Sequence, residues 1–287
     1  MSISPIDLRH CEDLEALSEL VGVLGKCGDP HDFLLVGAMA RDVLLHYAHG
    51  IKVDRATLDA DFALAVKDWK DFESLSNELL RDRQFSKDSN RLQRFQYQRS
   101  LRVDIIPFGG VENPDRKVEW PTDGGTVLDV LGYREAMATS LKVILPGNQT
   151  LAVVSLPALA ILKIVAWNYR HRAEPLKDAD DLWLILKNYL EAGNWERLNE
   201  EAEHLLAEDD FDLDRAGAWL LGCDARKVLM TGVDPAFSIS RIDSILKPQI
   251  ASKIPSLLPV EMWRPQPELA LQLLAAFHSG LTGRTKP

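Results

Sequence analysis

The stretch from Phe33 to Ala48 reads FLLVGAMARDVLLHYA and carries the first fold signal of this 287-residue chain. Phe33–Val36 is a short apolar run ending at Gly37, which is typical of a buried strand. Residues 38–48 have apolar side chains at helical spacing, which predicts a helix. A turn from strand to helix directs free backbone amides toward an anion. Gly37 is therefore either an ordinary turn residue or a point where the backbone approaches phosphate closely.

Two carboxylates lie close together in the next strand-like segment, residues 58–66, which reads LDADFALAV. Asp59 and Asp61 are two positions apart, so in a strand they project side by side from one face. Because like charges in apolar surroundings repel each other, this pair needs a neutralising partner. Mg²⁺ would provide one, since it binds one or two carboxylates together with substrate phosphates. The alternative is a surface pair without a site function.

A third carboxylate, Asp104, lies in the apolar run of residues 101–108, LRVDIIPF, which predicts another strand. Residues 94–99 alternate polar and aromatic side chains, and we expect the two sequential strands to pair. If the strand of Asp104 also lies beside the first two carboxylates, all three meet on one sheet face. Such a set suits two metal ions at a phosphoryl displacement. The alternative is an ion pair between Asp104 and Arg94 or Arg102.

The rest of the chain predicts an α+β fold. An amphipathic helix is expected from about Asp68, whose carboxylate can cap the first turn. Residues 157–170 predict a helix that is apolar on most faces and carries one lysine, Lys163; its side chain either serves the site or extends to solvent. A further helix is expected over residues 178–190. We expect a small mixed β-sheet with flanking helices in residues 1–190, followed by a mostly helical domain in residues 191–287.

Composition and charge limit the class of protein. The formal net charge is −10, and no apolar run approaches the roughly 18 to 20 residues that a bilayer span needs. The first twenty residues are acidic and lack an apolar signal core, so we expect a cytoplasmic protein with no membrane association. Three cysteines without paired spacing indicate reduced thiols: Cys11, Cys27 and Cys223.

One stretch concentrates positive charge. It contains seven basic residues, Arg81, Arg83, Lys87, Arg91, Arg94, Arg99 and Arg102. Such a stretch either attracts nucleic-acid phosphates or forms a solvated surface. If these side chains line the site they favour RNA, whereas an acidic rim would favour a cationic small molecule.

The order of these motifs resembles the polymerase β-type nucleotidyltransferase superfamily: a strand, a glycine turn and a helix, then the D-x-D pair, then the third carboxylate. Residues 36–45, VGAMARDVLL, are similar to the G-G-x-x-R-D-x-L-L signature of CCA-adding enzymes. The chain departs from that signature at Ala38, where Gly or Ser is usual; alanine keeps the amide but supplies no hydroxyl. Some superfamily members have lost catalysis, so a silent nucleotide- or partner-binding module is an alternative.

A broader resemblance is to the AbiEii-type nucleotidyltransferases, the toxin halves of type IV toxin–antitoxin systems. It spans residues 35–185 and includes that family's fourth motif of a lysine, an arginine and K/R-D-x-x-D. The corresponding residues here are Lys163, Arg172, Lys177, Asp178 and Asp181.

The resemblance implies a role for each residue. Asp59 and Asp61 would hold Mg²⁺ and the triphosphate, with two ions when NTP is bound, and Asp104 would complete the metal site or help to deprotonate the acceptor hydroxyl. Lys163 would face the phosphates. Asp178 and Asp181 share a helix face, so they would position Lys163, Arg172 or the nucleotide, unless Asp178 simply caps its helix. The nucleotide-contacting set would be Gly37, Ala38, Arg41, Arg172, Lys177, Asp178 and Asp181.

The implied activity is magnesium-dependent transfer of a nucleoside monophosphate from an NTP to an acceptor. RNA, tRNA-like, is the acceptor that the resemblance suggests, and an antitoxin protein is the implied partner. The alternatives are transfer to a small molecule such as an aminoglycoside, which the acidic balance favours, or to a protein side chain.

Overall fold

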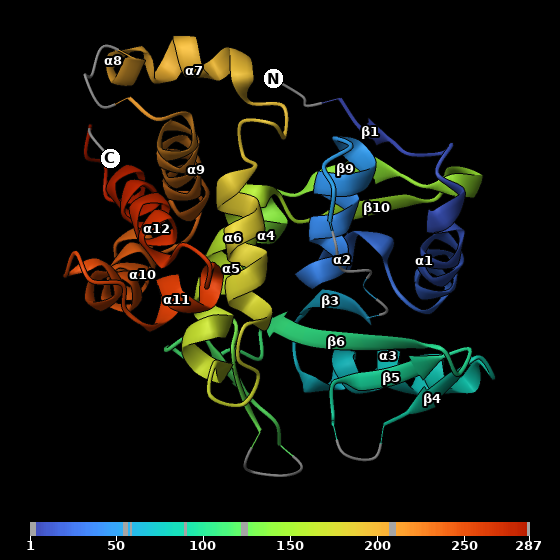
Figure 1. Cartoon of the computed structure of the whole chain (residues 1–287). Helices are drawn as coiled ribbons and strands as arrows, with labels where there is room; N and C mark the ends of the chain where they lie inside the picture. Colours follow the sequence, from blue (N-terminus) through green and yellow to red (C-terminus); the bar gives the residue numbers. More distant parts are fainter. Residues whose placement is uncertain are drawn as a thin grey trace. The chain divides into compact units, whose positions relative to one another are not determined.

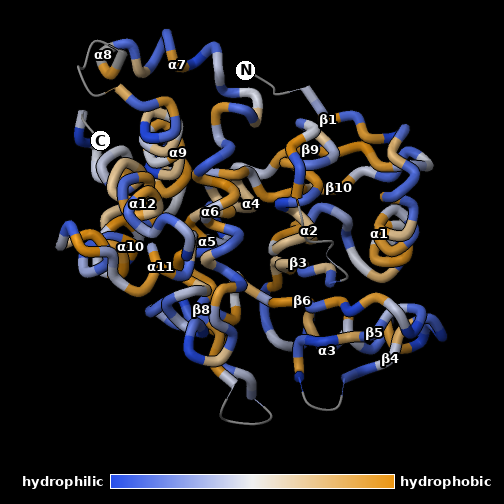
Figure 2. Tube along the Cα trace, in the orientation of Figure 1, coloured by the Kyte–Doolittle hydropathy of each residue, from blue (hydrophilic) through white to orange (hydrophobic). Residues whose placement is uncertain are grey.

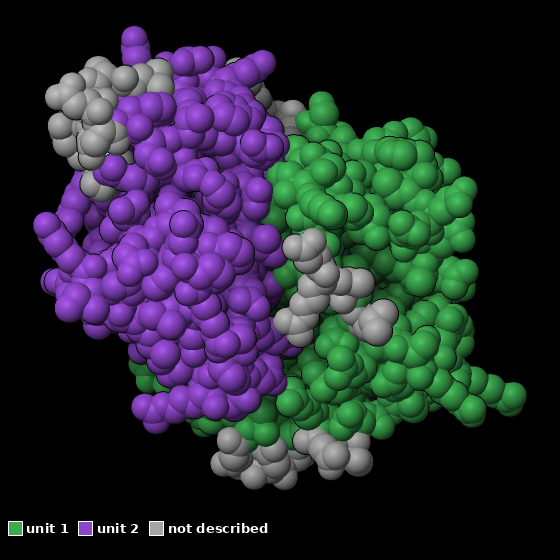
Figure 3. All heavy atoms as spheres, in the orientation of Figure 1, with its two compact units in different colours: residues 1–155 green, residues 156–287 purple. Residues whose placement is uncertain are grey.

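The computed structural model describes residues 4–53, 57, 59–88, 91–121, 126–206 and 211–285. The chain forms two compact units, residues 1–155 and 156–287 (Figure 3). The predicted α+β fold is confirmed, because the described strands all belong to the first unit and the second is built from helices. Leu58, the expected start of a strand, lies outside the described residues.

The first unit is organised around a mixed sheet, as predicted, but the sheet is larger than the small one expected. Its described residues form eight strands in the order β1-β9-β10-β2-β3-β6-β5-β4 (Figure 1). Central strand β3 is antiparallel to β2 and parallel to β6, and β5 pairs antiparallel with β6 as expected. The strands are β1 Ile6–Asp7, β2 Phe33–Val36, β3 Asp59–Val66, β4 Phe85–Lys87, β5 Arg94–Tyr97, β6 Leu101–Gly109, β9 Leu141–Ile144 and β10 Thr150–Val153, with β7 Lys117–Glu119 and β8 Val127–Asp129 in a separate small sheet.

Helices and short turns connect these strands. The predicted helix after Phe33–Val36 consists of α2 and a π-helical continuation, η3. Asp68 caps α3 as predicted, because its side chain accepts hydrogen bonds from the backbone N–H groups of Lys70 and Asp71 at 2.8 and 3.1 Å. The elements are η1 Glu12–Leu14, α1 Glu15–Cys27, η2 Pro30–Asp32, α2 Gly37–Asp42, η3 Val43–Ala48, α3 Trp69–Arg81, α4 Tyr133–Ala138 and η4 Pro146–Asn148.

The two faces of the central strands have different character. Phe33 and Phe62 lie on one face and pack edge to face, with ring centroids 6.3 Å apart. Leu75 of α3 lies beside Phe33 near Gly28, so α3 covers this apolar face. Side chains of the alternate positions point to the opposite face, which carries the acidic residues described below.

The second unit is helical in its described residues. It contains α5 Leu156–Arg170, α6 Lys177–Lys187, α7 Trp195–Glu201, α8 Glu203–Leu206, α9 Leu213–Leu229, α10 Pro235–Ile250, α11 Leu257–Met262 and α12 Pro267–Leu281. Helix α5 is mostly buried and packs against α6, α9 and α10, whereas α7 is mostly hydrophilic (Figure 2). Helices α9 and α12 touch through glycines: a Cβ at Gly222 would lie 2.0 Å from the Phe277 carbonyl oxygen.

The division between the compact units falls at Ser155, whereas the sequence placed a domain boundary near residue 190. The difference arises because α5 is apolar on most faces and needs helices around it. Those helices come from the chain that follows, so α5 and α6 belong to the second unit.

Two further expectations bear on the class of protein. The three cysteines carry free thiols. No helix in the described part of the chain has the length and apolar character needed to cross a membrane.

Candidate functional site

The acidic face of the sheet brings the three predicted carboxylates together. In the parallel pairing of β3 with β6, Asp61 lies opposite Asp104 and Asp59 lies opposite Arg102. Residues opposite each other in a ladder point to the same face, as do residues two apart in one strand. Asp59, Asp61 and Asp104 therefore share one face, the arrangement on which the three-carboxylate hypothesis depends.

Arginines pair with two of these carboxylates. Arg94 lies opposite Asp104 in the β5–β6 pairing, and its Nε and Nη2 donate to the two Asp104 oxygens at 2.7 Å each. Arg102 Nε donates to Asp59 Oδ1 at 2.6 Å. The hydrogen bonds to Asp104 raise the pKa of Arg94 above its usual value. The alternative pairing expected for Asp104 is thus present, with Arg94 as the partner.

The third carboxylate, that of Asp61, lies against Gly37. Its φ is +72°, and a Cβ at this position would lie 2.1 Å from Asp61 Oδ2. Glycine is required here for two reasons, the left-handed backbone angle and the close approach of the Asp61 side chain. The group that approaches Gly37 in this structure is a carboxylate of the protein, and the expected approach of a phosphate stays a prediction.

The side chain of Arg41 is turned inward. It is 2% exposed, and its Nε donates to Asp42 Oδ1 at 2.8 Å. Ala38, by contrast, is partly exposed in the first turn of α2. The expected contacts of Ala38 and Arg41 with a nucleotide stay predictions.

The second unit contains a buried charge cluster formed by Lys163, Arg170, Asp178 and Asp181. Lys163 is 3% exposed; its Nζ lies 3.3 Å from Asp178 Oδ1 and forms an ion pair with Asp181. Arg170 Nε and Nη2 donate to the two Asp178 oxygens at 2.6 and 2.7 Å. The alternative in which Lys163 extends to solvent is therefore wrong.

Opposite charges keep Lys163 and Asp178 ionised. Burial alone would lower the pKa of Lys163, but the charges of Asp181 and Asp178 outweigh burial and raise it. Burial likewise favours the neutral form of Asp178, yet hydrogen bonds from Arg170 and the charge of Lys163 lower its pKa below the usual value. Lys163 and Asp178 are thus charged at neutral pH.

Arg170 is the member of the cluster that sequence reasoning missed. Helix α5 ends at Arg170, so Arg172 lies in the following turn, where it is exposed and has no hydrogen bond or ion pair with another described residue. Lys177 is the first residue of α6, and its Nζ lies 3.7 Å from Glu174 Oε2. The signal for Arg170 was its position seven residues after Lys163, two helical turns along the same face.

The acidic face offers the donors that a hard cation requires. Carboxylate oxygens are preferred ligands of Mg²⁺, and the space left by the absent Cβ of Gly37 holds the Asp61 carboxylate. Asp59, Asp61 and Asp104 therefore fit a divalent cation by donor type and shared face. Across the described residues, no group of three or more His, Cys, Asp and Glu side chains is arranged as a metal site, and arginines neutralise Asp59 and Asp104 instead.

Comparison with known proteins gives a family match that covers most of the chain. The model of the family described as "Nucleotidyl transferase AbiEii toxin, Type IV TA system" matches residues 20–251, a range that contains both charge clusters. No curated protein matches the chain. Among solved structures, that of the antibiotic-resistance factor ANT(2'')-Ia in solution is 11% identical over 66% of this chain and 96% of that chain, with a TM-score of 0.35.

Proposed function

The chain belongs to the AbiEii family of nucleotidyltransferases, and on that premise we propose that it transfers a nucleoside monophosphate from an NTP to an RNA acceptor with Mg²⁺ as cofactor. The observation that carries the proposal is the register of β3 and β6, which aligns Asp59, Asp61 and Asp104 on one sheet face. The family description supports a protein antitoxin as the partner of this chain.

The acidic face would bind the metal and the triphosphate. Asp59 and Asp61 would hold Mg²⁺, two ions being expected with NTP present, and Asp104 would complete the set or accept the proton of the attacking hydroxyl. When bound, Mg²⁺ supplies positive charge against the negative charge that develops on the phosphates. Arg94 and Arg102 would then exchange their carboxylate partners for phosphate oxygens, which guanidinium groups bind equally well.

By the family resemblance, the residues of the fourth motif would serve the nucleotide. Lys163 is 3% exposed and pairs with Asp178 and Asp181, so it would act by holding that cluster in place. Arg172 and Lys177 present exposed or partly exposed cations beside this cluster. Gly37 and Ala38 would offer backbone amides in the first turn of α2.

Basic residues of the acidic face support RNA as the acceptor. Arg94 and Arg102 both lie on this face, and the Arg102 side chain is 51% exposed. Lys87 does not share the face, because its Nζ lies 3.8 Å from the centroid of the Phe95 ring on the other side. With Mg²⁺ bound to the carboxylates, Arg94 and Arg102 would be available to the phosphates of an RNA acceptor, whereas a cationic aminoglycoside would meet two guanidinium groups there.

The test is a labelling assay. The purified chain is incubated with Mg²⁺, total RNA and each α-labelled NTP in turn, beside the variant Asp59→Ala/Asp61→Ala. We expect label in RNA with the intact chain and a loss of about 10³-fold in the variant. Label in an added aminoglycoside but not in RNA would identify the aminoglycoside, rather than RNA, as the acceptor. No transfer together with no Mg²⁺-dependent NTP binding would establish a silent binding module.

A further inference from the structure

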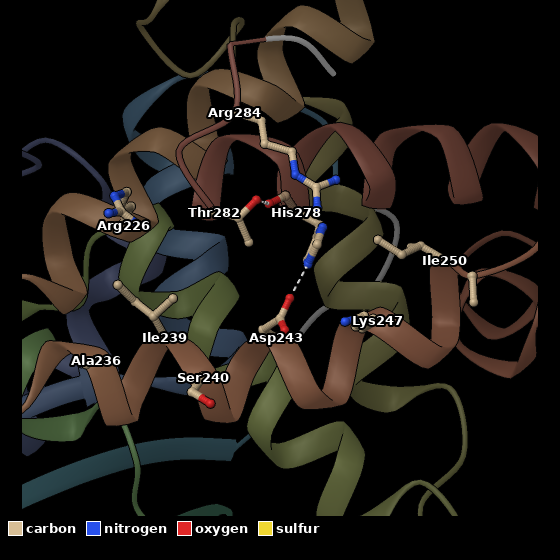
Figure 4. Close-up of a pocket in the computed structure, with 11 residues that line it drawn as sticks. Arg226, Ala236, Ile239, Ser240, Asp243, Lys247, Ile250, His278, Thr282 and Arg284 are labelled. Carbon is tan, nitrogen blue, oxygen red and sulfur yellow. Dashed lines mark hydrogen bonds and ion pairs between the residues drawn. The ribbon is translucent and has the colours of Figure 1, made fainter.

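A pocket in the second unit lies away from the buried charge cluster. It has a volume of about 730 Å³ and is lined by residues of α9, α10 and α12 and by the segment after α12 (Figure 4). Figure 4 shows Asp243 and Lys247 on α10 facing His278, Thr282 and Arg284 across the same space. The volume lies within the range of roughly 300–1,000 Å³ of small-molecule sites.

The pocket has an excess of positive charge. Arg226, Lys247 and Arg284 line it, and within the described part of the chain none of the three side chains has a carboxylate partner; the Arg226 guanidinium donates to the Leu281 carbonyl oxygen at 3.2 Å. The one acidic lining residue, Asp243, accepts a hydrogen bond from His278 Nε2 at 2.6 Å.

Other basic side chains of the second unit show the contrast. Several of them are paired with carboxylates, among them Arg170, Lys187, Arg197 and Lys227. Arg226, Lys247 and Arg284 instead line a single pocket without such partners among the described residues, in a chain of formal net charge −10. Mutual repulsion of these cations disfavours the empty pocket, and an anion would relieve it.

We propose that this pocket binds the phosphate group of a nucleotide-sized organic anion. Arginine forks match phosphate oxygens, and Lys247 adds a point charge. The lining also contains the apolar side chains of Ile239 and Ile250 on α10, called the apolar wall below, which suit the organic portion of the ligand rather than a bare inorganic ion.

The phosphate can belong to a free nucleotide or to RNA, and the chemistry of recognition is the same for both. All lining residues lie in the second unit. The inference therefore does not rest on the proposed transfer reaction and can be tested without it.

The experiment measures binding to the full chain in EDTA, which withholds divalent cations from the acidic face. Calorimetric titrations with AMP, with inorganic phosphate and with a short 5′-phosphorylated RNA compare the natural chain, Lys247→Ala/Arg284→Ala and the control Lys253→Ala/Arg264→Ala. The control removes two exposed cations of the same unit that lie outside the pocket. Thermal melting monitored by circular dichroism verifies that each variant is folded.

We expect AMP to bind the natural chain and the control equally, and the pocket variant about tenfold or more weakly, because charge-assisted hydrogen bonds are lost. Inorganic phosphate should bind at least about tenfold more weakly than AMP, since it leaves the apolar wall uncovered. Binding of AMP should persist in Asp59→Ala/Asp61→Ala. If RNA bound and AMP did not, and the pocket variant lost the binding of RNA, the phosphate recognised by the pocket would belong to RNA.

Three results would overturn the inference. The first is that neither AMP nor RNA binds; the second is equal binding by the pocket and control variants. The third is equal affinity for AMP and inorganic phosphate, which would remove any role of the apolar wall.

Discussion

Asp59 and Lys163 both lie in ion pairs, but water reaches the two pairs to different extents. The Arg102 side chain that pairs with Asp59 is 51% exposed, whereas the Lys163 and Asp178 side chains are 4% and 2% exposed. An exposed pair contributes at most about 1 kcal/mol and can exchange partners. A buried pair cannot open without leaving a charge uncompensated in a low-dielectric interior. The Asp59–Arg102 pair of the acidic face is thus suited to exchange with a ligand, and the buried cluster to a fixed arrangement.

The largest expected effect is on stability and concerns the buried cluster. Replacing Lys163 by methionine removes the buried cation that pairs with Asp178 and Asp181. We expect the free energy of unfolding to fall by about 3–5 kcal/mol. Urea unfolding followed by tryptophan fluorescence measures this change, because five of the seven tryptophans lie in the second unit: Trp167, Trp183, Trp195, Trp219 and Trp263.

The matched variant on the acidic face is Arg102→Gln. Its pair with Asp59 is largely solvated, so the loss should stay below about 1 kcal/mol in the same urea experiment followed by circular dichroism. Equal losses in Lys163→Met and Arg102→Gln would remove the contrast between the two clusters.

A loss of stability between those of Lys163→Met and Arg102→Gln is expected at Gly37, the glycine beside the Asp61 carboxylate. Gly37→Ala places a Cβ 2.1 Å from Asp61 Oδ2 and also strains the backbone at φ +72°. Gly147→Ala is the control, because its φ is +66° and nothing lies within 4 Å of the added Cβ. We expect the free energy of unfolding to fall by about 1 kcal/mol in the control, from backbone strain alone. In Gly37→Ala it should fall by about 2–3 kcal/mol.

The labelling assay separates the two causes at Gly37. A displaced Asp61 should reduce transfer in Gly37→Ala and leave Gly147→Ala unaffected. If both variants lost the same stability and kept full transfer, the close approach at Gly37 would have no role.

The smallest expected effect is the dependence of stability on pH. The folded pKa of Asp178 lies below its usual 3.8, so its contribution is complete above that value and is lost as pH falls through the folded pKa. The folded pKa of Lys163 lies above its usual 10.5, so its contribution is complete below that value and is lost as pH rises through the folded pKa. The natural chain and Lys163→Met should therefore differ in the free energy of unfolding by a constant amount from about pH 5 to about pH 9. The difference should become smaller below and above this range. Urea unfolding over a pH series measures it, and a difference that stays unchanged down to about pH 2 would contradict it.

Much of the first unit follows from local patterns in the sequence. The apolar run before Gly37, the alternation around Asp61 and the cap at Asp68 are all set by neighbouring residues, so periodicity and turn chemistry predict them. The pairing of the strands of Asp61 and Asp104 was a condition in the sequence argument and is a fact of the structure. The choice of Arg94 rather than Arg102 for Asp104 depends on the β5–β6 register, which the sequence alone leaves open.

The second unit was harder to predict because its charges meet through packing. The motif spacing directed attention to Arg172. Helix α5 ends at Arg170, however, and only a residue inside the helix can lie on the same helix face as Lys163. The cations of the α9–α10–α12 pocket are far apart in the sequence, with Arg226, Lys247 and Arg284 on three different segments. No local period connects them, so only the packed helices bring them together.

The parallel pairing of β3 with β6 also has a consequence for the order of folding. Parallel neighbours need a long crossover, and here α3, β4 and β5 form it, so Arg102 and Asp59 are separated by 43 positions. Lys163 and Asp178 are separated by only 15, within a helical hairpin. Because closing a short local loop is faster than assembling a distant pairing, we expect the helical hairpin to form first on the refolding pathway. The acidic face would then be among the last parts of the chain to assemble, so a partly folded molecule would lack its carboxylate set.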